Sequence, residues 1–139
     1  MLNTDIIHPE LMQALAEAGH GARILMGDSN YPVTVKAAPG ARRVYLNFIP
    51  GMIDGVSIVR ALAKTIPIES AMYMTPDSGE MPEIIGEYHA LVGKDVPFEA
   101  KGRFPFYDEA ASPDTCLVIA SGDQRVFANL LITVGVRKA

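Results

Sequence analysis

The chain has 139 residues, of which 49% are hydrophobic and 20% charged, with a net charge of −4 and an isoelectric point near 5.3. This length suits one domain over residues 1–139, and the apolar fraction excludes a disordered chain. The acidic balance, without any basic run, argues against binding to nucleic acid. No apolar stretch reaches the length of a membrane span, so we expect no membrane partner.

The compartment is predicted from the start of the chain and from its cysteine content. The first ten residues lack the basic and then apolar pattern of a signal peptide. The single cysteine, Cys116, leaves no partner for an internal disulfide, which suits a reducing, cytoplasmic environment. Because Cys116 lies in an apolar run, we expect a buried and unreactive thiol rather than a nucleophile.

The first half of the chain alternates predicted helices and strands. Residues 9–18 form a predicted helix, with Pro9 in its first turn and Gly19 just beyond its end. The apolar run 24–26 is too short for a helix and indicates a strand at residues 23–26. A proline- and glycine-containing stretch at 31–43 then predicts an extended loop. A short strand at 44–46, a helix at 54–65 and a strand at 68–74 are expected next.

The second half continues this alternation. Helical spacing of apolar residues predicts a helix at 82–93, followed by a short edge strand at 98–101 and a helix at 106–112. A strand is expected at 117–120, and residues 130–134 are either the last strand or the end of a helix-to-strand unit. Strands that alternate with helices require crossover connections, so the sequence predicts an α/β fold with a mainly parallel sheet.

Two polar residues flank the strand predicted at 23–26. His20 lies just before it, and Asp28 lies just after it. Ligands of open α/β sheets bind at the carboxyl ends of strands, which is where Asp28 is expected. Histidine side chains can transfer protons near neutral pH, so His20 is a candidate proton carrier, and Asp28 can orient it or bind a hydroxyl. The alternatives are that His20 only ends a helix and that Asp28 only forms a turn.

Metal and cofactor sites are not indicated by the sequence. The three histidines lack the spacing of metal ligands. The glycines at 19 and 21 precede a strand rather than follow it, so they do not form a dinucleotide-binding motif.

Arg103, flanked by aromatic residues, is either a solvated charge or a ligand-binding group. The methionines at 72, 74 and 81 are expected to fill the core or an interface.

Three groups of residues occur in the order found in a known family. They are His20 with Gly27-Asp28 and Pro32; Arg103-Phe-Pro-Phe-Tyr107; and Ser121-Gly-Asp123 followed by Phe127-Ala-Asn129-Leu-Leu131 and Gly135-Val136. With these residues the chain resembles the ribose pyranase and fucose mutarotase family, and residues 103–107 resemble its fucose branch.

The resemblance implies a three-layer α/β/α fold and a mutarotase that interconverts the anomers of a free monosaccharide, L-fucose or a related sugar, without a cofactor. It implies that His20 and Asp28 act in catalysis and that Arg103 and Asn129 bind the sugar, while Tyr31 and Phe127 are candidates to stack on it. It also implies a homo-oligomer, a decamer of two pentameric rings, with active sites shared between neighbouring subunits.

One residue departs from the family pattern. The family usually has tyrosine two places before the asparagine, whereas this chain has Phe127, so a hydroxyl that would contact sugar or relay a proton is missing. Two alternatives therefore stay open: a monosaccharide-binding protein without catalysis, or a pyranase that acts on ribose.

Overall fold

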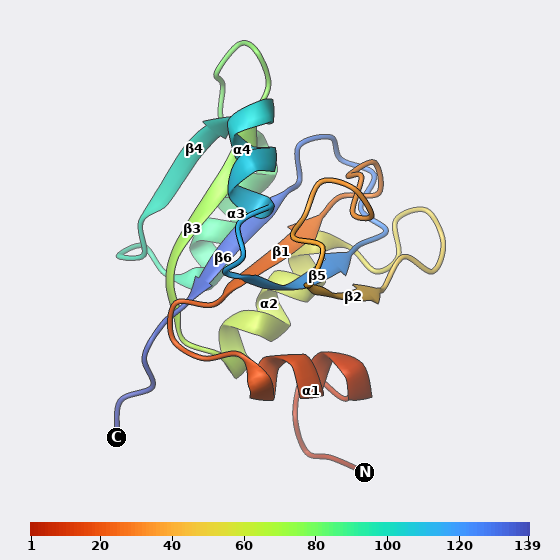
Figure 1. Cartoon of the computed structure of the whole chain (residues 1–139), viewed down its shortest axis with the longest axis vertical. Helices are drawn as coiled ribbons and strands as arrows, with labels where there is room; N and C mark the ends of the chain where they lie inside the picture. Colours follow the sequence, from red (N-terminus) through yellow and green to blue (C-terminus); the bar gives the residue numbers. More distant parts are fainter.

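A six-stranded sheet lies at the centre of the computed structural model, which describes residues 1–139 (Figure 1). The strands are β1 (Arg23–Gly27), β2 (Arg42–Tyr45), β3 (Ile68–Thr75), β4 (Phe98–Gly102), β5 (Thr115–Ala120) and β6 (Leu130–Val134). Their order across the sheet is β2-β5-β1-β6-β3-β4. Only β6 is antiparallel to its neighbours, β1 and β3, so the prediction of a mainly parallel sheet is confirmed.

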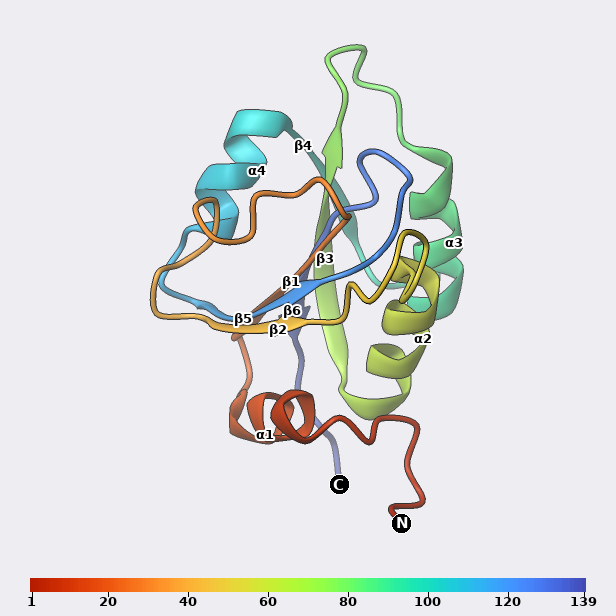
Figure 2. The same ribbon diagram turned by 90° about the vertical axis from the view of Figure 1, so that its right-hand side faces the viewer.

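Helices cover both faces of this sheet. The four helices are α1 (Pro9–Glu17), α2 (Gly55–Thr65), α3 (Glu83–Val92) and α4 (Arg103–Ala110). In Figure 2, α2 and α3 lie on one side of the sheet and α4 lies on the other. The expected three-layer α/β/α arrangement is therefore present. None of the four helices combines the length and the apolar character needed to cross a bilayer.

Alternating side chains of the strands divide the core into two clusters. Ile24 and Met26 of β1 join the larger cluster, to which α1, α2 and α3 contribute. Leu25, between them, points to the opposite face and joins the cluster that contains Phe106 and Ala110 of α4. β1 is thus buried on both faces, which explains why its sequence is a continuous apolar run.

The loop between β1 and β2 differs from the extended loop predicted at 31–43. Its residues 33, 37, 38 and 41 are buried against the sheet and α4. Arg43 fixes it by donating hydrogen bonds to the carbonyl oxygens of Val33, Ala38 and Ala41, at 2.9–3.1 Å. The loop therefore completes the α4 side of the molecule, and this places Tyr31 beside the end of β1.

Two further details correct the sequence predictions. α4 begins at Arg103, three residues before the predicted helix start at 106, because Pro105 lies in the first turn, where its missing N–H is not needed. Arg103 is consequently the first residue of this helix. Cys116 is half-buried rather than buried, and desolvation raises the pKa of its thiol, which keeps it protonated and unreactive.

Candidate active site

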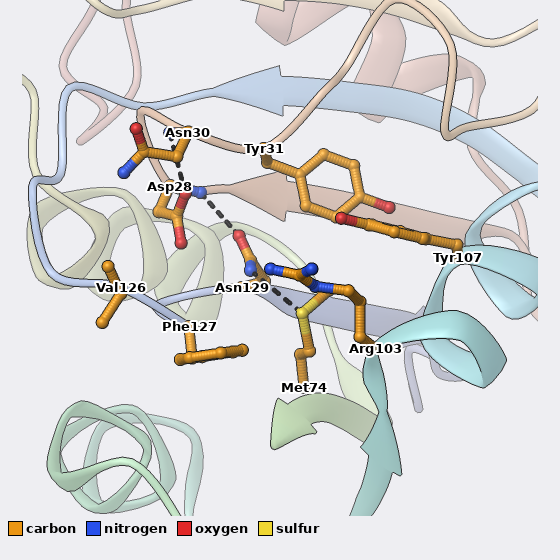
Figure 3. Close-up of a pocket in the computed structure, with 9 residues that line it drawn as sticks. All are labelled: Asp28, Asn30, Tyr31, Met74, Arg103, Tyr107, Val126, Phe127 and Asn129. Atoms are coloured by element: carbon orange, nitrogen blue, oxygen red, sulfur yellow. Dashed lines mark hydrogen bonds between the residues drawn. The ribbon is translucent and has the colours of Figure 1, made fainter. Parts of the chain in front are cut away.

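A pocket of about 120 Å³ opens at the carboxyl ends of the parallel strands (Figure 3). β1 and β3 run in the same direction on either side of β6, so their carboxyl ends meet the amino end of β6 at one edge of the sheet. The residues that line it are Asp28, Asn30, Tyr31, Met74, Arg103, Tyr107, Val126, Phe127 and Asn129. Five of the six residues that the sequence predicted as site residues are among them.

Asp28 and Asn129 form the polar floor of the pocket. Asp28 directly follows β1 and Asn129 directly precedes β6, so the antiparallel ladder places them side by side. The backbone N–H of Asp28 donates to Oδ1 of Asn129 at 2.7 Å, and Nδ2 of Asn129 contacts Sδ of Met74 at 3.8 Å (Figure 3). These contacts fix the orientation of the amide and leave one of its two N–H donors available to a ligand.

Asp28 is 4% exposed, and this burial is the main influence on the acidity of its carboxyl group. Burial raises its pKa above the ordinary value of 3.8, against the opposing effect of backbone N–H groups at Asn30, Ala128, Phe127 and Tyr31. The amide of Asn30 donates to Oδ1 at 2.9 Å. A carboxyl group with a raised pKa in a pocket is suited to accepting or returning protons.

Aromatic side chains form one wall of the pocket. Tyr31 is buried against Phe106 and Tyr107 in edge-to-face contacts, with ring centroids 6.1 and 5.5 Å away. Its hydroxyl donates to the carbonyl oxygen of Lys36 at 2.7 Å. Gly27 makes room for this ring, because a Cβ there would lie 2.7 Å from the Cβ of Tyr31. The Tyr31 hydroxyl is therefore used by the fold, and only its ring is offered to a ligand.

Arg103 contributes a positive charge at the mouth of the pocket. It extends from the start of α4, directly after β4, and is exposed. None of the ion pairs in the chain involves its guanidinium. A planar guanidinium without an acidic partner can donate to two adjacent hydroxyl groups.

Phe127 forms the wall opposite Tyr31 and adopts an uncommon backbone conformation. Its φ is +63°, in the left-handed region that bulky residues rarely occupy. The half-buried ring lines the pocket next to the exposed Val126. The site thus combines an acceptor, Asp28, with donors on Asn129 and Arg103 and with apolar rings.

His20, the sixth predicted site residue, lies elsewhere in the chain. It precedes β1, so it is at the opposite edge of the sheet from Asp28, and β1 alone spans about 16 Å at about 3.3 Å per residue. Asp28 therefore does not orient the His20 of its own chain. The partner of His20 is Glu69 at the start of β3, whose Oε2 lies 2.8 Å from Nε2, with both side chains about half exposed.

Several pocket residues were not predicted from the sequence. Met74 is buried in the core, as expected, and at the carboxyl end of β3 it also lines the pocket. The signal available was its position: parallel strands end at a common edge, so the last residues of the ladder of β3 lie near the residue that follows β1. Asn30 and Val126 are exposed loop residues that carry no such signal. No three His, Cys, Asp or Glu side chains gather closely enough to hold a metal ion.

Comparison with known families decides the classification. The model of the RbsD / FucU transport protein family matches residues 1–137. The chain belongs to this family. Among curated relatives, a fucose mutarotase of Danio rerio is 27% identical, with 94% of this chain and 90% of that protein covered. A D-ribose pyranase of Variovorax paradoxus is 25% identical, with 98% of each protein covered.

Solved structures agree in fold. FucU from Bifidobacterium longum is 28% identical and superposes with a TM-score of 0.81 over 95% of this chain and 96% of that one. RbsD of Bacillus subtilis in complex with D-ribose gives a TM-score of 0.85 at 21% identity, over 99% and 100% of the two chains. A fucose mutarotase of Streptococcus pneumoniae in complex with L-fucose gives 0.84 at 22% identity, with the same coverage. These last two likenesses show the fold.

Proposed function

We propose that this protein is an isomerase that interconverts the anomers of a free monosaccharide, with L-fucose or a related sugar as substrate. The observation that carries the proposal is the convergence of Asp28, Arg103 and Asn129 on one pocket of a chain that belongs to the RbsD / FucU family. Relatives named fucose mutarotase and D-ribose pyranase support the same class of reaction.

The pocket suits a neutral polyhydroxylated ring. The free N–H of Asn129 and the guanidinium of Arg103 donate to hydroxyl groups, and the carboxyl group of Asp28 accepts from them. Phe127 and the aromatic wall around Tyr31 cover the C–H faces of the sugar. Neither wall requires a charge on the ligand.

Anomer exchange requires proton transfer at two oxygens of the sugar. A base removes the proton of the anomeric hydroxyl while an acid protonates the ring oxygen, so that the ring opens to a carbonyl. Rotation about the bond to the carbonyl carbon and the reverse transfers then close the ring on the other face. Asp28, with its raised pKa, supplies one of the two groups, and His20 supplies the other.

His20 must reach the pocket from a neighbouring copy. Within one chain it lies at the far edge of the sheet from Asp28. The pocket of about 120 Å³ is also smaller than the 300 Å³ or more that is usual for enclosed small-molecule sites, so a second wall would complete it. We therefore propose a closed homo-oligomer, a decamer of two pentameric rings, whose subunit contacts join His20 to the pocket of the next chain.

A monosaccharide-binding protein without catalysis is the second candidate. It is favoured by Phe127, which gives the pocket no hydroxyl at the position where the family usually has tyrosine. Binding and orientation of the sugar would persist in such a protein, whereas anomer exchange would not be accelerated.

Saturation-transfer NMR on the anomeric protons separates the two candidates. With L-fucose, we expect the protein to raise the exchange rate above the buffer rate, and Asn129→Ala to remove most of this increase. Arg42→Ala, which breaks an exposed ion pair with Glu17 away from the pocket, is the matched control. Sugar binding by calorimetry with no increase in exchange for L-fucose, D-ribose or related sugars would establish the binding protein instead.

A further inference from the structure

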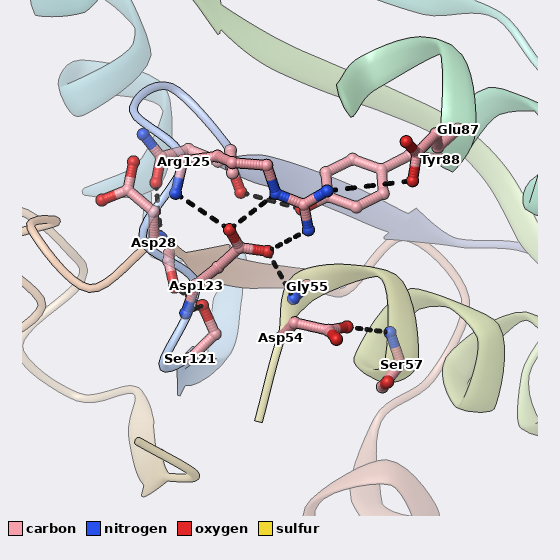
Figure 4. A network of polar contacts seen from close by, with 12 residues as sticks. Asp28, Asp54, Gly55, Ser57, Glu87, Tyr88, Ser121, Asp123 and Arg125 are labelled. Atoms are coloured by element: carbon pink, nitrogen blue, oxygen red, sulfur yellow. Dashed lines mark hydrogen bonds and ion pairs between the residues drawn. The ribbon is translucent and has the colours of Figure 1, made fainter. Parts of the chain in front are cut away.

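An ion pair within the loop at residues 121–129 joins the buried carboxylate of Asp123 to Arg125, whose side chain is 45% exposed (Figure 4). Asp123 is 2% exposed, and its carboxylate accepts from Nε and Nη2 of Arg125 at 2.9 and 2.6 Å, which is a bidentate arrangement. The backbone N–H of Arg125 donates to the same carboxylate at 3.0 Å. The N–H of Gly55, at the start of α2, donates to its Oδ2 at 2.8 Å.

The backbone of Asp123 is tied to the other side of the site. Its carbonyl oxygen accepts from the N–H of Ser29, the residue after Asp28, at 2.9 Å. Its N–H donates to Oγ of Ser121 at 3.2 Å, and that hydroxyl donates to the carbonyl oxygen of Gly27 at 2.7 Å. Asp123 therefore connects the end of β1, the start of α2 and the loop at residues 121–129.

A further contact holds the end of this loop. The hydroxyl of Tyr88 on α3 donates to the carbonyl oxygen of Ala128 at 3.2 Å, between the two pocket residues Phe127 and Asn129. Arg125 also approaches Glu87 of the same helix, with Nη1 and Oε2 3.9 Å apart. The loop is thus attached to α2 through Asp123 and to α3 through Arg125 and Ala128.

These attachments explain how Phe127 stays in the left-handed region. A bulky residue there is disfavoured by its own backbone sterics and persists only where the surroundings over-determine it. The contacts of Asp123 and Tyr88 bracket Phe127 on both sides along the chain. Releasing the contact on the Asp123 side would let residues 124–127 relax towards commoner backbone angles, which would turn the Phe127 ring and move Asn129 relative to Asp28.

We propose that Asp123 is a positioning residue: its ion pair with Arg125 and its bond to Gly55 hold the loop at 123–129 so that Phe127 and Asn129 meet the ligand beside Asp28. Its effect on sugar exchange rests on the proposed function, whereas its effect on the geometry of the pocket does not. The carboxylate is charged at neutral pH: burial acts to raise its pKa, but the hydrogen bonds from Arg125 and Gly55 outweigh burial and lower it below 3.8.

Asp123→Asn tests this role, because it keeps the shape of the side chain and removes its charge. In the full-length protein we expect sugar exchange to fall by ~10-fold to ~10²-fold, the larger figure being the cost that a displacement of about 1 Å can have. The NMR signals of the Asp28 amide and of the Asn129 side-chain amide should shift as well, because their mutual hydrogen bond depends on the loop. Arg125→Lys keeps the positive charge but lacks the planar guanidinium, so it should give smaller changes in the same direction. It serves as the test variant if Asp123→Asn does not fold.

Arg23→Met is the matched control, because it breaks a partly buried pair with Glu109 at the opposite edge of the sheet. We expect it to lower the melting temperature without shifting the Asp28 and Asn129 signals. The proposal is overturned if the Asp28 and Asn129 signals stay at their wild-type positions in folded Asp123→Asn and Arg125→Lys, as they are expected to do in Arg23→Met. If the wild-type protein accelerates exchange of no sugar, the proposed function fails, and the NMR signals still decide the role of Asp123.

Discussion

Mixing two inactive variants is expected to restore about a quarter of the active sites, provided that each site is shared between two copies. His20→Ala removes the proton carrier, and Asn129→Ala removes the amide that orients the sugar. Neither variant alone contains a complete site. In a randomly mixed oligomer with equal amounts of both, half of the positions supply an intact His20 and half supply an intact Asn129, and the product of the two fractions is about one quarter.

The structure explains why restoration requires two copies. His20 and Asn129 lie at opposite edges of the sheet, separated by the full length of β1, about 16 Å. No rotation of the His20 side chain crosses that distance. A complete site therefore combines His20 of one subunit with the pocket of its neighbour, and an isolated chain should be inactive.

The assay is anomeric exchange by saturation-transfer NMR after unfolding and refolding the two variants together, with mixed oligomers verified by native mass spectrometry. As a control, wild-type chains are mixed equally with chains that carry both substitutions. A shared site again gives about a quarter of the wild-type rate, whereas a site within one chain gives about half. Full mixing without restored exchange, together with half activity in the control, would refute the shared site.

Three further predictions concern single residues of the pocket. Phe127→Tyr should raise the exchange rate or widen the range of sugars on which the protein acts. If the new hydroxyl finds no hydrogen-bond partner, the variant instead loses roughly 1–3 kcal/mol of stability. Its melting temperature would then fall without any gain in exchange rate. Arg103→Ala should weaken sugar binding about tenfold or more by calorimetry while melting is unchanged, because the side chain is exposed; unchanged affinity would count against its role. Burial raises the pKa of Asp28 above 3.8, so its contribution to stability is present at low pH and is lost as pH rises through the raised pKa. The free energy of unfolding of Asp28→Asn should therefore rise relative to that of the wild type between about pH 4 and neutrality. The gain is about 1.4 kcal/mol for each unit by which the pKa of Asp28 is raised. Urea unfolding curves that show no such trend would contradict this reasoning.

Most of the fold could be predicted because its elements carry local signals. The apolar run of β1 and the proline and glycine residues around α1 indicate where these elements begin and end. The direction of β6 could not be predicted, because apolar periodicity is the same for a strand in either direction. The start of α4 lies three residues before the predicted one, because proline is tolerated in a first helical turn and Pro105 therefore does not delay the helix.

The pocket could be predicted in part because Asp28 follows a parallel strand, and the family motifs name Arg103 and Asn129. The position of His20 was harder to judge, since residues that flank a short strand look close in sequence yet lie at opposite edges of the sheet. The contacts of Asp123 with Gly55 and of Tyr88 with Ala128 join segments 68 and 40 residues apart. Such contacts leave no periodic signal in one sequence, and only the folded chain reveals them.

The most direct test of the account is the exchange rate of His20→Ala, measured by saturation-transfer NMR with L-fucose alongside sugar binding by calorimetry. Because His20 is half exposed and distant from its own pocket, the variant should fold and assemble as the wild type does. The account predicts a loss of ~10²-fold or more in catalysed exchange, the scale of a positioned proton carrier, with sugar binding retained. Exchange at the wild-type rate in the assembled variant would contradict it.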